Sequence, residues 1–298
     1  MKIIDAHHHF WDLDQNYLPW LRDEPPIPFR YGDYSALKRN FMPADYRALT
    51  GRFDVIGSVY IEAEFDPNAP LAETAWVAEV KEEHGLPSVM VAQAWLDRGD
   101  APDLLSAYGR DPLVRGIRHK PASAPDPRDA KRGAPGSMDD PRWRDGYSLL
   151  EPNGLSFDLQ TPYWHLDAAY ELAKDFPDTR IIVNHTGLPA DRSDDGLKQW
   201  RKALSLIADA PNAALKISGI GLPGRPWTVE DNEPVVLDAI SIFGSDRIMF
   251  ASNFPVDGLT ASFETIFSGF DRITAGFSDE NRAAMFCENA RRIYRMEI

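Results

Sequence analysis

Eight short apolar runs with extended character recur along the chain, and polar or helical stretches separate them. The runs are Lys2–His9, Val55–Ala63, Ser88–Leu96, Val114–Lys120, Leu155–Gln160, Arg180–Gly187, Ala213–Gly219 and Arg247–Asn253. Helical patterns between and after them include Leu71–Glu83, Tyr163–Asp175, Leu197–Ala210, Glu233–Phe243 and Asp279–Tyr294. Alternation of strands and helices predicts a parallel sheet covered by helices. Eight such units in 298 residues predict one domain, a (β/α)8 TIM barrel over residues 1–298.

The connections between these elements are unequal in length. Helix-to-strand turns are short and rich in glycine and proline, whereas the segments 10–43 and 121–140 that follow strands are long. Loops at the carboxyl ends of barrel strands build active sites. We therefore expect loops 10–43 and 121–140 to cover an active-site mouth. The first strand lacks a following Gly-x-Gly-x-x-Gly, so no dinucleotide fingerprint is present.

Charge and composition narrow the choice of partners. The 46 acidic and 32 basic residues give a net charge of −14, which argues against nucleic acid and anionic membranes as partners. The single cysteine, Cys287, excludes an intramolecular disulfide and favours a reducing, cytoplasmic location. The sequence shows neither a signal-peptide pattern nor an apolar run long enough to span a membrane. The sequence is compatible with a homo-oligomer.

The most informative residues are the three consecutive histidines that end the first strand. Side chains alternate along a strand, so His7 and His9 share one face and His8 points the opposite way. Converging imidazoles are typical of a metal site, above all zinc. The alternative is a polar strand end whose histidines only form hydrogen bonds.

The same two-residue period can be followed on the other strands. We expect apolar members such as Val59 and Ile61 to face the helices, and polar members near the strand ends to line the mouth. The polar set is Glu62, Gln93, Arg118, Asp158, Gln160, His185, Lys216, Ser218 and Asn253. Each of these residues taken alone could have a purely structural role; Lys216, for example, could form an ion pair with Asp158. Burying all of them without a function would be costly, which favours a site for a small anionic or polyhydroxylated substrate.

Five ordered motifs at these strand ends resemble the amidohydrolase superfamily, in its amidohydrolase-2 branch of sugar-acid and aromatic-acid lactonases. They are Asp5-Ala-His-His-His-Phe-Trp-Asp12, Gly116-Ile-Arg-His119, Asn184-His-Thr-Gly-Leu-Pro189, Lys216-Ile-Ser-Gly219 and Met249-Phe-Ala-Ser-Asn-Phe-Pro255. The resemblance covers the whole chain. It implies a (β/α)8 barrel that hydrolyses at a carbonyl, with His7, His9 and His185 as ligands of a divalent metal.

One position departs from that family pattern. Asn253 stands where an aspartate usually completes the metal site and takes a proton from water. A neutral amide cannot act as a general base and is a poorer metal ligand. The proton acceptor is therefore open among His185, Glu62 and Asp158, and zinc is expected only if a metal is used at all.

The resulting hypothesis is a hydrolase that opens the ring ester of a small lactone, derived from a sugar acid. His185, Asn253 and Glu62 are the candidate catalytic residues, and Arg118, Gln160, Lys216 and Trp11 the candidate substrate ligands. Two rivals use the same site: a lactone isomerase, which consumes no water, and a nonoxidative aromatic-acid decarboxylase. A barrel that only binds its ligand is a further alternative, favoured by Asn253 alone.

Overall fold

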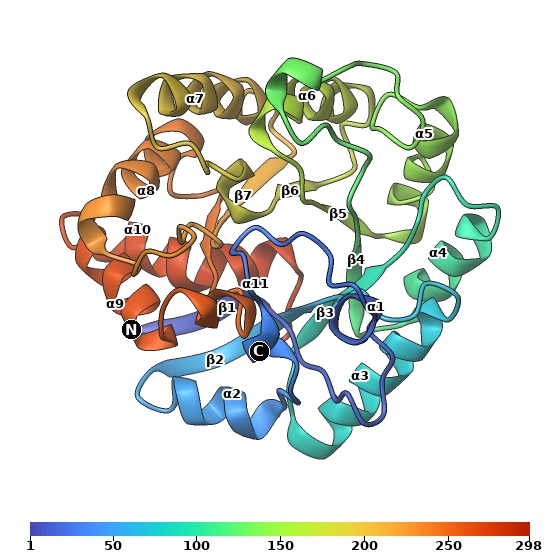
Figure 1. Ribbon diagram of the computed structural model, residues 1–298, viewed down its shortest axis with the longest axis horizontal. Coiled ribbons are helices and arrows are strands. Elements are labelled where there is room, and N and C mark those ends of the chain that lie inside the picture. Colours follow the sequence, from blue (N-terminus) through green and yellow to red (C-terminus); the bar gives the residue numbers. More distant parts are fainter.

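The computed structural model describes residues 1–298 and shows eight parallel strands in a ring (Figure 1). The strands follow the order β1 to β8 around the sheet. Their bounds are β1 Lys2–His8, β2 Asp54–Ile61, β3 Val89–Gln93, β4 Val114–His119, β5 Ser156–Leu159, β6 Ile181–Val183, β7 Ala213–Ile217 and β8 Ile248–Phe250. The ring closes just beyond β8, where His9 N–H donates to Phe254 O at 2.8 Å and Asn253 N–H to His7 O at 2.8 Å. The predicted TIM barrel is confirmed.

Most of the helices surround this ring on its outer side (Figure 1). The helices are α1 Pro19–Arg22, α2 Pro43–Thr50, α3 Pro70–His84, α4 Ala101–Arg110, α5 Pro141–Tyr147, α6 Leu166–Asp175, α7 Asp194–Ala208, α8 Val229–Phe243, α9 Phe263–Ile273, α10 Asp279–Ala283 and α11 Asn289–Ile293. Of these, α1 lies in front of the strands and α11 lies across one end of the barrel (Figure 1). Several begin at a serine whose hydroxyl accepts a backbone N–H, as Ser193 does from Gly196 at the start of α7. No helix is long and apolar enough to cross a membrane.

The inner surface of the barrel is more apolar than the strand patterns predicted. Val59, Ile61 and Met249 belong to a buried cluster inside the ring, whereas Tyr60 points outward and donates its hydroxyl to Glu73 of α3. The expectation that Val59 and Ile61 face the helices was wrong. Both faces of a barrel strand are buried, so apolar residues suit either face and alternation does not reveal which is which.

A bulge in β1 sets the direction of the three histidines. The pairing of β1 with β2 advances from Asp5–Ser58 to His8–Tyr60, so β1 carries one extra residue there. His8 consequently packs outward against the rings of Phe10 and Tyr46 at centroid distances of 4.5 and 4.8 Å. His7 and His9 turn inward, as predicted.

The end of the barrel opposite the long loops is closed by the C-terminal segment. A π-helical turn, Ala284–Glu288, links α10 to α11, and Cys287, Ile293 and Tyr294 join the inner apolar cluster. The Tyr294 hydroxyl reaches Asp158 in the barrel at 3.0 Å. We call this closed end the floor and the opposite end the mouth.

Candidate active site

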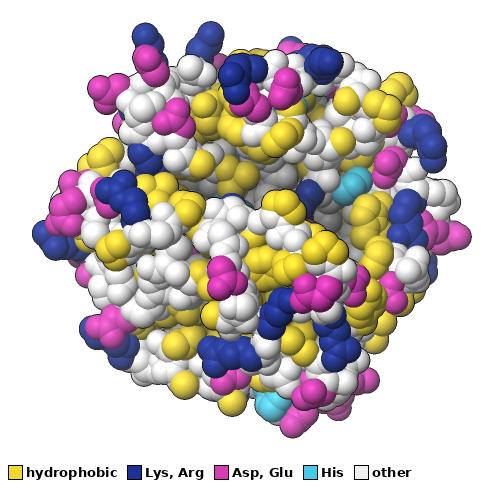
Figure 2. Space-filling model, viewed as in Figure 1, with side chains coloured by type: hydrophobic (Ala, Val, Ile, Leu, Met, Phe, Trp, Pro, Cys, Tyr) yellow, Lys and Arg dark blue, Asp and Glu magenta, His cyan; other side chains and the backbone are white.

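A cavity of about 300 Å³ lies at the mouth, where the molecular surface is hollowed near its middle (Figure 2). Six of the predicted site residues line it: His9, Trp11, Arg118, Gln160, His185 and Asn253. Loop 10–43 crosses in front of the strands in Figure 1 and supplies the aromatic part of the wall, including Trp20 and Phe29. Loop 121–140 was expected to share this role, but it contributes no lining residue.

Three imidazoles cluster at the mouth, and two of them, His9 and His185, line the cavity. The His7 ring lies 5.0 Å from that of His9 and 4.6 Å from that of His185, between centroids. His9 Nδ1 is 2.8 Å from the Ile61 carbonyl, which can only accept, so Nδ1 carries the proton and Nε2 the lone pair. His185 Nδ1 lies 3.0 Å from the Ser218 hydroxyl.

All three rings are neutral near pH 7. Burial lowers the pKa of His7, His9 and His185 well below the usual value, and nearby cations lower each pKa further. The largest of these cationic contributions are from Lys216 on His7, Arg118 on His9 and Arg30 on His185. Neutral imidazoles retain a lone pair that can accept a proton or bind a metal.

The donor types in this cluster fit a divalent ion. Both nitrogens of His7 are buried without a hydrogen-bond partner, and the Nδ1 contacts of His9 and His185 resemble those that orient metal-binding histidines. However, no group of three or more His, Cys, Asp or Glu side chains gathers its donor atoms around one point. When bound, such an ion would polarise a carbonyl oxygen.

Asn253 is held by a network that the sequence motifs did not reveal. Its amide donates to Asp257 Oδ1 at 2.7 Å, and the same carboxylate accepts the Tyr31 hydroxyl at 2.9 Å and pairs with Arg30 at 3.4 Å. Arg30 lines the cavity, and its Nη1 is buried without a partner. Arg30 and Tyr31 come from the irregular loop 10–43, where no periodicity could single them out.

Arg118 lines the cavity, but all of its nitrogens have partners. Nε pairs with the Glu62 carboxylate, Nη2 donates to Glu62 O at 2.6 Å and Nη1 to Gln160 Oε1 at 3.2 Å. Glu62 does not line this cavity; its second oxygen accepts the Glu64 N–H at 2.7 Å. Glu62 therefore holds Arg118 and Glu64 in place, with one partner on each of its two carboxylate oxygens.

Lys216 lies beneath the cavity and does not line it. The lysine is fully buried and donates to Asp158 Oδ1 at 2.5 Å, which confirms the pairing that the sequence left open. Asn184 Nδ2 and the Tyr294 hydroxyl donate to the same carboxylate. The predicted role of Lys216 in substrate binding would require it to leave these partners.

Backbone strain is concentrated around the cavity. Six residues other than glycine have positive φ, and four of them line it: Glu64, His185, Leu188 and Asn253. Ile181 and Val183 pack outward, and strict alternation along the strand would place His185 on the same outward face. The backbone at His185 is left-handed, with a φ of 52°, and this turn brings the His185 ring inward. Strain of this kind costs about 1–3 kcal/mol per residue and clusters at functional sites.

Comparison with known proteins agrees with this geometry. The profile of the Amidohydro_2 family, described as amidohydrolase, matches residues 4–296. The chain belongs to the amidohydrolase family. This amidohydrolase is 42% identical over 296 residues to the uncharacterized protein y4mH of Sinorhizobium fredii, covering 99% of both chains.

Two further similarities bear on chemistry and on fold. An L-fucono-1,5-lactonase of Burkholderia ambifaria is 28% identical over 262 residues, which cover 87% of this amidohydrolase and 82% of the lactonase. The crystal structure of an amidohydrolase from Burkholderia multivorans with bound zinc superimposes with a TM-score of 0.81 at 24% identity, covering 100% of both chains. The second similarity supports the barrel fold.

Proposed function

We propose that this amidohydrolase hydrolyses the ring ester of a sugar-acid lactone. The observation that carries the proposal is the pair of neutral imidazoles, His9 and His185, beside the unpartnered guanidinium nitrogen of Arg30 in one cavity. A proton acceptor and an oxyanion ligand are what addition of water to a carbonyl requires. The relative named L-fucono-1,5-lactonase supports the choice of lactone.

In this mechanism His185 is the base. With Nδ1–H donated to Ser218, Nε2 accepts a proton from water while the water oxygen bonds to the lactone carbonyl carbon. Arg30 stabilises the oxyanion. The ring C–O bond then breaks, and the imidazolium returns its proton to the departing ring oxygen, which leaves a hydroxy acid. His9 and Asn253 orient the water, Gln160 and Lys120 bind substrate hydroxyls, and Trp11 covers the ring.

We propose as the metal-bound alternative that His7, His9 and His185 would hold a divalent ion, zinc being the first candidate; His185 Nε2 would then be a ligand, and another group would take the proton from water. Elemental analysis of protein purified without chelators tests this, with about one equivalent per chain expected. Less than about a tenth of an equivalent, with turnover unchanged by added zinc or manganese, would reject the metal and leave the lactonase proposal intact.

The function itself is tested with a panel of 1,4- and 1,5-lactones of hexonic and 6-deoxyhexonic acids. A pH indicator follows acid release at pH 6.5, where spontaneous ring opening is slow, and NMR identifies the products. We expect a hydroxy acid, with turnover lost in His185→Ala. Conversion between ring sizes without acid release would instead identify an isomerase, and carbon dioxide from hydroxybenzoates a decarboxylase. Binding without turnover of any of these compounds would leave a non-catalytic barrel.

A further inference from the structure

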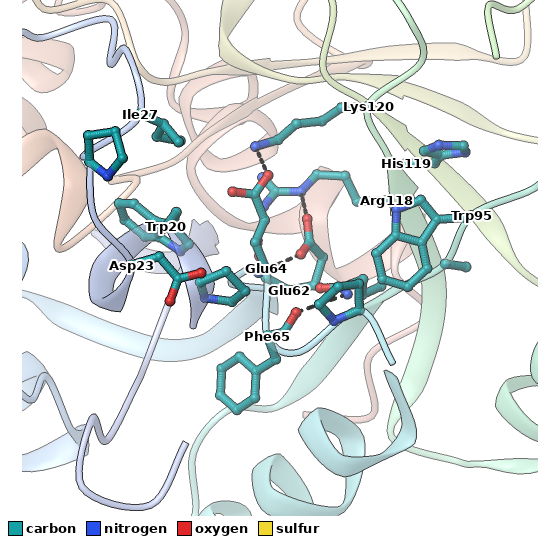
Figure 3. A pocket seen from close by; sticks show the side chains of 15 residues that line it. Trp20, Asp23, Ile27, Glu62, Glu64, Phe65, Trp95, Arg118, His119 and Lys120 are labelled. Carbon is teal, nitrogen blue, oxygen red and sulfur yellow. Dashed lines mark hydrogen bonds and ion pairs between the residues drawn. The ribbon is translucent and has the colours of Figure 1, made fainter. Parts of the chain in front are cut away.

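A second cavity, of about 330 Å³, lies directly beside the catalytic one, over the ends of β2, β3 and β4 (Figure 3). The two cavities share wall residues, among them Trp20, Arg118 and the ion pair Glu64–Lys120. Both side chains of that pair are 40% exposed. The partition is thus made of the ends of two flexible side chains, and a ligand in one cavity would reach the other if they moved apart.

The second cavity contains a buried acceptor without a donor. Gln93 is 4% exposed, and its amide nitrogen donates to Phe65 O at 3.3 Å. Its Oε1 is buried with no hydrogen-bond partner. An unsatisfied buried acceptor carries a desolvation cost, which a ligand hydroxyl would recover. A purely hydrocarbon or aromatic ligand would leave this cost in place.

The cations that line this cavity are already paired, whereas the carboxylate of Asp23, which also lines it, accepts only the Tyr17 hydroxyl. Arg118 pairs with Glu62, and Lys120 with Glu64 (Figure 3). Burial alone would raise the pKa of the Glu64 carboxyl, but Lys120 and Arg118 lower this pKa overall, so the carboxyl stays ionised near pH 7. No cation is left over for a second carboxylate, and Asp23 offers an acceptor for ligand hydroxyls. The cavity therefore suits an uncharged, hydroxyl-bearing ligand.

Two indoles supply flat faces for such a ligand. Trp95 is held by the guanidinium of Arg98, whose Cζ lies over the indole at 4.7 Å from the ring centroid, as in a cation–π contact. Trp20 is fixed by its Nε1–H, which donates to Ala63 O at 2.9 Å. Aromatic faces carry negative potential and attract the weakly positive C–H groups of a ring that lies on them.

A ring that offers hydroxyls, no charge and a C–H face is a sugar. We propose that this cavity binds a second sugar residue, so that the substrate is the lactone of a disaccharide acid. The lactone ring occupies the catalytic cavity and the non-lactone sugar lies between Trp20 and Trp95, with one hydroxyl donated to Gln93 Oε1. This inference rests on the proposed lactonase function and specifies its substrate class. The reaction that supplies such a substrate is oxidation of a reducing disaccharide at its anomeric carbon.

The kinetic test compares the 1,5-lactones of cellobionic and melibionic acids with gluconolactone. We expect kcat/KM at least tenfold higher for one disaccharide lactone. Trp95→Ala should abolish this preference while retaining turnover of gluconolactone. Trp164→Ala is the matched control, because Trp164 is half-buried at the same end of the barrel and lines neither cavity. Gln93→Leu, which removes only the acceptor, gives an independent variant and should reduce the preference severalfold.

A binding measurement separates this inference from the lactonase proposal. Cellobiose and melibiose contain no lactone, so calorimetry with them tests the cavity whether or not the protein is a lactonase. Binding of either sugar that Trp95→Ala weakens about tenfold, in protein that hydrolyses no lactone, would keep the sugar site and reject the function. Hydrolysis of gluconolactone with no preference for either disaccharide lactone, and no binding of either sugar, would overturn the sugar site alone.

Discussion

The two ends of this barrel use the same eight strands for opposite purposes. At the floor, Tyr294 reaches into an apolar interior. The buried Lys216–Asp158 ion pair beside it is satisfied, because Asp158 accepts from both Lys216 and the Tyr294 hydroxyl. At the mouth, both nitrogens of His7, one of Arg30 and an oxygen of Gln93 are buried without partners. Satisfied polar groups contribute to stability; an unsatisfied one is a candidate ligand contact where it lies at a cavity, which the unpartnered nitrogens of the outward His8 do not. The contrast assigns stability to the floor and chemistry to the mouth.

The largest expected effect is at the mouth. His185→Ala should lower kcat for lactone hydrolysis about 10²–10⁴-fold, because it removes the proposed proton acceptor. Initial rates at pH 6.5 and circular dichroism of the same sample measure activity and folding. His8→Phe is the matched control, since His8 packs outward among aromatic rings and should keep its turnover. Equal losses in both variants would remove the distinction between inward and outward histidines.

The next largest effect is expected at the floor. Lys216→Met should lower the free energy of unfolding by about 3 kcal/mol, because it leaves the buried Asp158 without its cation. Turnover per folded molecule should change only a few-fold. Urea unfolding provides the measurement, with Lys174→Met as the control: Lys174 forms an exposed pair with Glu171, worth at most about 0.5 kcal/mol. A large loss of turnover in folded Lys216→Met would instead show that Lys216 takes part in substrate binding or catalysis.

At the mouth, Asn253→Asp should reduce the activity less than His185→Ala does. The new carboxylate would face Asp257, and two like charges in contact raise the pKa of one of them. We expect kcat/KM to fall about tenfold, as for one displaced hydrogen bond of about 1.4 kcal/mol. Metal content is measured alongside activity. A rise in both would show that the natural site is a weakened form of the usual metal centre, and full activity in Asn253→Ala would leave this residue without a chemical role.

A further effect appears only in acid. Burial lowers the pKa of the outward His8 to about 3, although a backbone hydrogen bond to His9 opposes the shift. The unfolded chain therefore binds a proton at His8 below about pH 6.5 that the folded chain does not bind, and stability falls with pH down to about 3. His8→Phe should reduce this slope by about 1.4 kcal/mol per pH unit, seen in urea titrations from pH 4 to 6.5. An unchanged slope would contradict the buried, neutral His8.

The sequence allowed the barrel to be predicted because strand and helix periods repeat eight times. It also indicated that His7 and His9 share a face, since the side-chain alternation of β1 resumes after the bulge. Alternation could not orient Val59 and Ile61, because apolar residues suit both buried faces of a strand. His185 points inward because its backbone makes a left-handed turn, and no residue pattern predicts such a turn.

Contacts between residues far apart in the chain could not be predicted from the sequence either. Glu62 seemed a free carboxylate at a strand end, but Arg118 and the Glu64 N–H occupy its oxygens. Arg30 meets Asp257 across 227 positions, from a loop without periodicity. The assignments of His185, Asn253, Gln160 and Trp11 remain predictions for the experiments above.

The closure of the ring has a consequence for how the protein is made. Asp5 accepts the N–H and the hydroxyl of Ser252, a contact that spans 247 positions, and β1 packs on the turn at Ala284–Glu288. The first strand therefore waits for its last neighbours until about 247 further residues have been synthesised. Until they emerge, β1 has an unpaired edge, and contacts of such long range form slowly. During this interval the nascent chain depends on protection from aggregation, and its three site histidines cannot yet meet.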